Sequence, residues 1–201
     1  FVRYIEHLQK YEVDYGEVNL SGAGEGSVEI MTIHKSKGLE FPIVILAGMG
    51  KQFNMQDLNA RLLIHPDYGL GADAILPDRR LIVSTLYKQV IRRKLLEETL
   101  GEEIRVLYVA LTRAKEKLIM TGTIGNLEKR LLSLYRFREN DQELLPAETR
   151  LNGKTYWDYV LPALARHRCM DELFEEFGLL PSHDNLLYDD PAEFQVKRIT
   201  A

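Results

Sequence analysis

Two short segments hold the residue types that could do chemistry on phosphate groups. Residues 31–41 read Met-Thr-Ile-His-Lys-Ser-Lys-Gly-Leu-Glu-Phe, so hydroxyl, imidazole and ammonium donors stand beside one carboxylate. Residues 102–115 read Glu-Glu-Ile-Arg-Val-Leu-Tyr-Val-Ala-Leu-Thr-Arg-Ala-Lys. Such donors suit phosphate oxygens, and an arginine keeps its charge when it is buried and offers a planar fork of N–H groups. The two segments therefore favour phosphate chemistry, with Arg113 as the first candidate.

A third segment only imitates a phosphate-binding loop. Gly22–Ser27 is rich in glycine, but it lacks the Lys and Ser/Thr that follow such a loop, and it precedes an expected strand rather than a helix. We interpret it as a plain loop. The chain has no Gly-x-x-x-x-Gly-Lys-Ser/Thr pattern and no acidic strand pattern that would seat magnesium. A nucleotide would therefore find no primary binding site here.

The charge balance excludes one kind of nucleic-acid binding. The formal net charge is −4, so the chain is not a polybasic module that binds DNA through bulk charge, and any contact must come from a local patch. Composition alone would assign each candidate patch to a solvated face. The patches are Lys35 with Lys37, residues 92–94, and Arg113 with Lys115 and Lys117.

Cysteine content and hydropathy limit the possible compartments. The single Cys169 rules out an internal disulfide framework and a cysteine-rich zinc site, and it fits a reducing compartment. The sequence has no run of 18 apolar residues and no signal-peptide pattern, so nothing points to a membrane or to export. The chain opens on Phe1 rather than Met, and we expect it to be part of a longer polypeptide.

The elements expected to position the two segments alternate strand with helix. Residues 28–33 and 43–47 are predicted strands, and the second is apolar without alternation, as in a strand covered on both faces. Residues 51–85 are rich in Asn, Asp, Gly and Pro and are predicted to be an irregular connection. Helices at 86–100 and 102–114, separated at Gly101, precede a predicted strand at 118–121. This order predicts an α/β domain with a largely parallel sheet.

The helix at 102–114 determines which side chains are expected to pack. At 100° per residue, Ile104, Leu107, Tyr108 and Leu111 share one side, and Arg113 points away from it. We expect Tyr108 to pack in the core rather than stack on bases, and the same holds for Trp157 and Tyr159. The remaining predictions are a helix at 1–12, a loop at 16–27, a helix at 127–137, a polar linker at 140–152, a helix at 154–168 bent or divided at Pro162, and a strand at 194–200.

The two segments resemble motifs V and VI of the superfamily 1 helicases related to UvrD. The first contains every fixed position of Thr-x-His-x-Ser/Ala-Lys-Gly-Leu-Glu-Phe, and the second contains Glu-Glu-x-Arg, Tyr-Val and Thr-Arg-Ala. Within that family, three further stretches resemble the AddA (RexA) subunit of the bacterial helicase–nuclease. They are residues 48–54, 92–96 and 156–168.

The resemblance implies a fold and a set of site residues. It implies a RecA-like lobe of the P-loop NTPase type over 1–137, followed over 138–201 by a linker and a mostly helical appendage that leads toward a nuclease domain. Arg113 would be catalytic, Glu40 would accept a hydrogen bond from the ribose, and Gly38 and Arg105 would also face the nucleotide. The motif positions implied to contact or couple DNA are Thr32, His34 and Lys37.

Simpler roles stay open for several of these residues. Arg113 could be a helix-end arginine paired with Glu102, and Glu40 could be a surface carboxylate. Arg105 could pair with Glu102 or Glu103 instead of lining a nucleotide cleft. His34 could be a structural histidine at a strand end.

The implied activity belongs to a longer protein. ATP and Mg would be bound mainly by a lobe outside this chain, and this chain alone would be inert and hold no metal or cofactor. The whole protein would act on single-stranded and duplex DNA ends with an AddB-like (RexB-like) subunit, in the bacterial cytoplasm on the nucleoid and away from membranes. The alternatives are a UvrD-like repair helicase without a nuclease and a degenerate lobe that serves as a scaffold.

Overall fold

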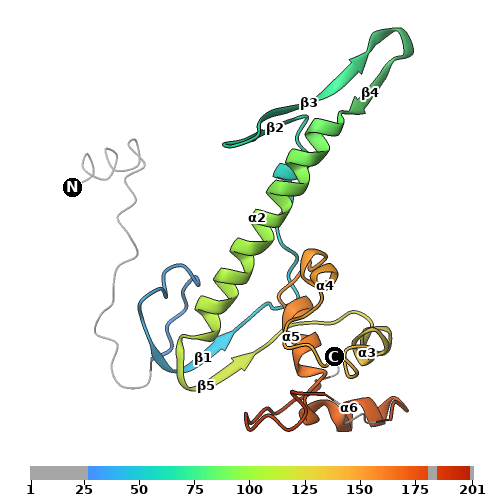
Figure 1. The fold of residues 1–201 in the computed structure, drawn as a ribbon. Helices are drawn as coiled ribbons and strands as arrows, with labels where there is room; N and C mark the ends of the chain where they lie inside the picture. The colour runs from blue at the N-terminus through green and yellow to red at the C-terminus, as the bar shows by residue number, and fades with distance from the viewer. Residues whose placement is uncertain (1–26, 181–184, 200–201) are drawn as a thin grey trace, which may run out of the picture. The chain divides into compact units, whose positions relative to one another are not determined.

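The computed structural model describes residues 27–180 and 185–199, and the chain divides into two units between Thr32 and Ile33. The second unit has a mixed α/β architecture, with a parallel pair of strands, an antiparallel sheet and helices (Figure 1). The predicted α/β class is therefore confirmed. The predicted helix at 1–12 and almost all of the predicted loop at 16–27, including Gly22–Gly26, lie outside the described residues.

The parallel pair joins β1 (Phe41–Leu46) to β5 (Ala114–Met120), and it confirms the strands predicted at 43–47 and 118–121. Phe41 pairs with Ala114 and Leu46 with Met120, with one irregularity between Phe41 and Ile43. The expectation that β1 is covered on both faces is wrong for this chain. Ile43 and Ile45 are 57% and 62% exposed, because the core cluster that contains Leu46 lies on only one side of the pair.

A single long helix, α2 (Leu86–Leu111), connects the two sheets. The predicted break at Gly101 is wrong, since one glycine costs only about 1 kcal/mol relative to alanine and the residues around it are strong helix formers. The Thr85 side chain caps the first turn by accepting a hydrogen bond from the backbone N–H of Lys88.

The buried side of α2 differs from the predicted one. Leu100, Leu107 and Ala110 are buried, whereas Tyr108 is 69% exposed and Ile104 is 37% exposed. The expectation that Tyr108 packs is therefore wrong in this chain. Helical periodicity gives the spacing of an apolar stripe, but which side of a wide stripe is covered depends on the tertiary neighbours.

The stretch predicted to be irregular, residues 51–85, contains an antiparallel sheet. Its strands lie in the order β2–β3–β4, and a turn of 3-10 helix lies before β2 and another before β4. The Asn, Asp, Gly and Pro residues that suggested a loop are concentrated in the turns, and the strands between them are short and apolar. The bounds are η1 Asp57–Asn59, β2 Leu62–His65, β3 Gly69–Leu76, η2 Pro77–Arg79 and β4 Leu81–Ser84.

The C-terminal part is helical. The predicted helix at 127–137 is confirmed as α3 but ends two residues earlier, and the predicted linker at 140–152 contains the short helix α4. The helix predicted at 154–168 is shorter, and Pro162 lies inside it without dividing it. The elements are α3 Leu127–Tyr135, α4 Ala147–Leu151, α5 Trp157–Leu164, η3 Arg168–Met170 and α6 Asp171–Glu176.

Two predicted strands do not form. Residues 28–33 contain no strand, and Val28 and Ile30 are 85% and 95% exposed; residues 194–199 also contain none, and Thr200 lies outside the described residues. Both stretches have strand-like composition. A strand also needs a neighbour to take its backbone hydrogen bonds, and composition does not report that neighbour.

Two hydrophobic clusters stabilise the second unit. One lies beneath the parallel pair and contains Leu46, Met49, Leu107, Ala110 and Tyr159. As predicted, Tyr159 and the partly buried Trp157 belong to the core. The other joins α3 to α5 and α6, so helices on both sides of the predicted boundary at 137/138 share one cluster. The division into a lobe and an appendage stays a prediction.

We predict that Gly101→Ala stabilises this unit. A Cβ at Gly101 would meet no heavy atom within 4 Å, and alanine is favoured over glycine in a helix interior by about 0.5–1 kcal/mol. Denaturant unfolding should show that gain. The matched control is Gly38→Ala, which has equally open space but a φ of +84° and should lose about 1–2 kcal/mol. A loss at Gly101 would contradict a continuous α2.

We predict that Asp158→Asn destabilises the start of α5. The Asp158 carboxylate accepts hydrogen bonds from the backbone N–H groups of Lys154 and Thr155 at 2.8 and 2.9 Å and from Arg130 at 2.6 Å. Losing the charge should cost about 1–3 kcal/mol in unfolding free energy at neutral pH. The exposed Asp141, changed to Asn, serves as the control.

The Asp158 effect should depend on pH. Burial alone would raise the pKa of Asp158, but the Lys154 N–H and the Arg130 guanidinium outweigh it and hold the pKa below its usual range. A lowered folded pKa gives stability that is present above the unfolded pKa, which is near 4, and is lost as the pH falls through the folded value. The gap between wild type and variant should therefore narrow in acid; a constant gap would exclude the ionised carboxylate as its source.

Candidate functional site

The segment of residues 33–38 folds as a pair of overlapping turns that presents polar side chains. Ser36 is buried, and both its N–H and its hydroxyl donate to the Ile33 carbonyl, at 3.1 and 2.7 Å. The Lys37 N–H donates to the His34 carbonyl at 3.3 Å, and Gly38 takes a left-handed φ of +84°. Because Ser36 holds the turn from inside, His34 and Lys37 are left exposed.

Arg113 connects the two motif segments. It follows the end of α2 and precedes β5. Its guanidinium Nη1 donates to the Leu39 carbonyl at 2.8 Å across a separation of 74 residues. Its Nε donates to the Val109 carbonyl at 2.9 Å, and Nη2 donates to the Thr112 hydroxyl at 3.0 Å. The side chain therefore does not pair with Glu102, which was one of the open alternatives.

The three Arg113 bonds leave part of the guanidinium available. Arginine has five N–H donors, and these bonds use the one on Nε and one on each terminal nitrogen. One N–H remains on each terminal nitrogen. Two donors on a planar fork match two oxygens of a phosphate or carboxylate.

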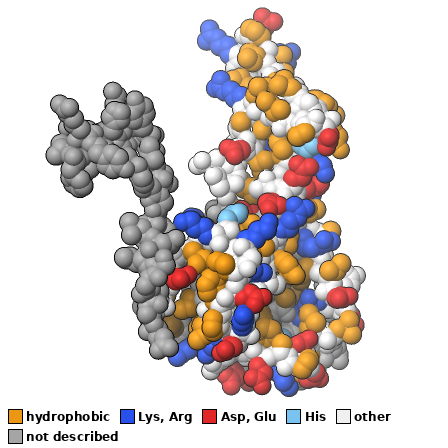
Figure 2. Space-filling model, turned by 90° about the vertical axis from the view of Figure 1, so that its left-hand side faces the viewer, with side chains coloured by type: hydrophobic (Ala, Val, Ile, Leu, Met, Phe, Trp, Pro, Cys, Tyr) orange, Lys and Arg blue, Asp and Glu red, His pale blue; other side chains and the backbone are white. Residues whose placement is uncertain are grey.

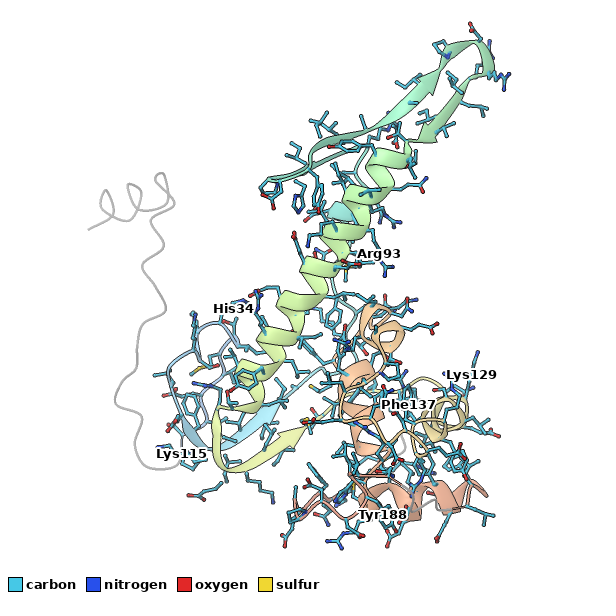
Figure 3. All side chains as sticks on the ribbon, in the orientation of Figure 1. His34, Arg93, Lys115, Lys129, Phe137 and Tyr188 are labelled. Carbon is cyan, nitrogen blue, oxygen red and sulfur yellow. The ribbon has the colours of Figure 1, made fainter. Side chains whose placement is uncertain are left out.

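Glu40 lies at the same edge of the parallel sheet as Arg113. Glu40 immediately precedes β1 and Arg113 immediately precedes β5, and the first residues of these strands, Phe41 and Ala114, are in register. The Glu40 carboxylate lies 3.2 Å from the Lys115 ammonium, and both side chains are more than half exposed. Figure 3 labels Lys115 at the start of β5 and His34 on the turn that precedes β1.

Arg105 and Thr32 are placed less informatively. Arg105 donates to the Glu102 carboxylate at 2.8 Å on the exposed surface of α2, which is one of the two pairings left open above. The neighbouring Glu103 accepts a hydrogen bond from the Tyr156 hydroxyl at 2.6 Å. Burial first, and the Glu103 carboxylate second, raise the pKa of Tyr156, so Tyr156 stays a neutral donor. Thr32 is exposed and belongs to the other unit.

The edge thus offers a fork of donors, a carboxylate and a second cation, all open to an incoming ligand. In residues 27–180 and 185–199, no three His, Cys, Asp or Glu side chains gather in a way that could hold a metal ion. In the same part of the chain, every helix is too short or too polar to cross a lipid bilayer. This edge can bind an anion and a hydroxyl group, and it contains no cradle for a triphosphate.

Sequence reasoning missed two participants at this edge. The Leu39 carbonyl, which holds Arg113, is a backbone group and has no sequence signature. Lys115 was assigned to a solvated basic patch, whereas it pairs with Glu40. Its position directly after the register pair Phe41–Ala114 was the available signal, but it required knowing that β1 and β5 are neighbours.

Comparison with known proteins agrees with the motifs. Over 197 residues the chain is 43% identical to the AddA-type subunit of the ATP-dependent helicase/nuclease of Clostridium botulinum, and over 196 residues it is 45% identical to its counterpart of the same name from Clostridium beijerinckii. Each alignment covers 98% of this chain, which spans only 15% and 16% of the length of those two relatives. The resemblance to AddA-type sequences is confirmed.

The family assignment rests on a match over more than half of the chain. Residues 7–124 match the UvrD-like helicase C-terminal domain, a range that includes both motif segments, the antiparallel sheet and the parallel strand pair. The chain therefore belongs to the UvrD-like helicase C-terminal domain family.

Proposed function

We propose that this chain is the second nucleotide-facing lobe of an ATP-dependent DNA helicase and that it supplies Arg113 to ATP bound mainly by another lobe. The observation that carries the proposal is the position of Arg113, which is held at the sheet edge by the Leu39 carbonyl with two N–H donors left over. A guanidinium brought to a γ-phosphate stabilises the charge that develops during phosphoryl transfer. An inserted arginine of this kind needs no phosphate cradle of its own.

The other residues of this edge would orient the nucleotide. Glu40, one residue past the carbonyl that holds Arg113, would accept a hydrogen bond from a ribose hydroxyl in exchange for its surface pairing with Lys115. Gly38 would allow the turn its left-handed conformation. Arg105 would exchange its Glu102 partner for the nucleotide. Magnesium would be coordinated outside this chain, together with the phosphates.

DNA would be contacted by the turn before β1. His34 and Lys37 are exposed donors on that turn, and Thr32 is an exposed hydroxyl just before it in the sequence. Contacts to phosphate oxygens fix position along a strand without reading its sequence, as a translocating motor requires. Because Leu39 and Arg113 share a hydrogen bond, a change at the nucleotide edge would be felt by the same turn.

For the whole protein we propose an ATP-dependent helicase and exonuclease that unwinds and degrades DNA ends during double-strand-break repair and recombination. The proposal rests on the name ATP-dependent helicase/nuclease that the relatives carry. It would act on single-stranded and duplex DNA ends with an AddB-like (RexB-like) subunit in the bacterial cytoplasm. Residues 138–201 would lead toward the nuclease, and this chain alone would hydrolyse no ATP.

We predict that Arg113→Ala in the full-length protein lowers DNA-stimulated ATP hydrolysis by a factor on the order of 10³ or more, with nucleotide still bound. The reason is the loss of a charge that acts in the transition state. Turnover and nucleotide affinity should be measured separately. Arg93→Ala is the matched control, since Arg93 is an exposed arginine of α2 that pairs with Glu97 one turn away and should leave turnover unchanged.

The Arg113 experiment has three adverse outcomes. Near-normal turnover in the variant would reduce Arg113 to a structural residue. A parallel fall in turnover, nucleotide affinity and unfolding midpoint would mean that its bond to the Leu39 carbonyl matters only for folding. An inactive wild type would favour the scaffold alternative.

We also predict that Glu40→Ala raises the KM for ATP by about tenfold or more, because a hydrogen bond to a charged acceptor is worth about 1.5–3 kcal/mol. The loss should be much smaller with a deoxyribose analogue of ATP that lacks the hydroxyl bonded to Glu40. Lys115→Ala removes the surface partner of Glu40 and should leave the KM nearly unchanged. Equal losses with ATP and with both the 2′- and 3′-deoxy analogues would show that Glu40 does not contact the ribose.

A further inference from the structure

The antiparallel sheet β2–β3–β4 has one face that is already occupied. Leu63 and His65 of β2 are 3% and 2% exposed, and a Cβ at Gly71 of β3 would lie 2.8 Å from the Lys88 Cα of α2. On the same face, the Asp73 carboxylate pairs with the Lys88 ammonium at 2.7 Å. This face therefore packs on the N-terminal half of α2.

The opposite face follows from the strand register. Residues that pair across an antiparallel ladder share a face, and residues alternate along each strand. Because Leu63 pairs with Gly71 on the packed face, their neighbours Leu62 and Ala72 lie on the other one. Continuing through β3 to β4 places eight residues on the open face, and all of them are apolar. Besides Ala72 and Ala74 they are Leu62, Ile64, Leu70, Leu76, Leu81 and Val83.

This composition does not suit a face in water. An antiparallel sheet with one packed face normally carries polar residues on the other. Here the six large side chains are between 40% and 67% exposed. Figure 2 shows hydrophobic side chains gathered over the upper end of the view, where this sheet lies. Contiguous apolar surface of this kind marks an interaction site.

The β3–β4 half is apolar on both faces. Ile75 and Ile82 form a cross-strand pair on the face that continues from α2, and they are 70% and 54% exposed. Beyond them, the connection contains Asp78, Arg79 and Arg80. An apolar ribbon that ends in a charged tip is the pattern of a strand pair inserted into other protein, with its tip in water.

We propose that the open face of β2–β3–β4 is the seat of another part of the same polypeptide, which covers it with an apolar sheet face or the apolar stripe of a helix. The face carries no Lys, Arg or polar side chain, so it lacks the donors that nucleic-acid phosphates require. It also lacks the polar groups of a transient interface and resembles a permanently covered core surface.

The length of the relatives indicates where the cover comes from. This chain is 43% identical to a protein of which it spans about 15%, so most of such a polypeptide lies outside the 201 residues. A surface that must stay covered through synthesis and folding is best covered by its own chain, because the local concentration of a tethered segment is high. The inference does not depend on ATP or DNA binding.

Photo-crosslinking in the full-length protein tests this directly. p-Benzoylphenylalanine would replace Ile64 on the open face or, as a matched control, Arg93 on the exposed side of α2. Isotopically light and heavy protein would be mixed, irradiated and digested, and the crosslinked peptides identified by mass spectrometry. We expect the probe at position 64 to capture a segment of the same polypeptide outside these 201 residues, in pure light or pure heavy pairs. The control should capture that segment at far lower yield.

Each other result overturns the proposal. Mixed light–heavy pairs would assign the face to a second copy, and a peptide from another protein would assign it to a separate partner. Capture of residues within this chain, or of none, would mean that no other part of the polypeptide covers the sheet.

A second measurement needs no crosslink. Leu70→Lys in the full-length protein should lower its unfolding midpoint, because a covered face would have to bury an ammonium group. Arg93→Glu, an equally drastic change of charge on an exposed residue, should leave the midpoint nearly unchanged. An unchanged midpoint in the Leu70 variant would show that the face is in water.

Discussion

The pairing of β1 with β5 is the constraint on which the candidate site depends. It brings together segments separated by more than seventy residues, and it is reinforced at the end where the site lies. There the Phe41 N–H donates to the Arg113 carbonyl at 2.9 Å, while the Arg113 guanidinium donates to the Leu39 carbonyl at 2.8 Å. The same residue thus ties backbone and side chain to the first motif. Neither motif could present its charged groups at this edge without the other.

The C-terminal helices contribute to that edge from below. The Trp157 backbone N–H donates to the Met49 carbonyl at 3.1 Å, and the Phe53 N–H donates to the Lys154 carbonyl at 2.8 Å. Met49 is fully buried, and Tyr159 shares its cluster with Leu107 of α2. The stretch after β1 is therefore clamped between the parallel pair and α5. Stability of the helical part and geometry of the motif edge are coupled through these contacts.

The sequence allowed the chemistry to be predicted further than the architecture. The motif residues, the two parallel strands and α3 follow from residue type and local pattern. The antiparallel sheet was missed because its turns are rich in Asp, Gly and Pro, which mask three short apolar strands. Gly101 suggested a break that the surrounding helix formers override, and the exposure of Tyr108 depends on what else packs nearby. The bond from Arg113 to the Leu39 carbonyl was beyond prediction, since every residue has such a carbonyl.

The continuity of α2 has a mechanical consequence. Its 26 residues span about 39 Å, and an uninterrupted helix bends little over that length. One end continues through Thr112 into Arg113, and the other packs against β2 and β3 (Figure 1). The helix therefore acts as a lever arm: a small tilt at the arginine becomes a displacement of several ångströms at the antiparallel sheet. Gly101, near its middle, is the most compliant point of that arm, so its replacement would change stiffness as well as stability.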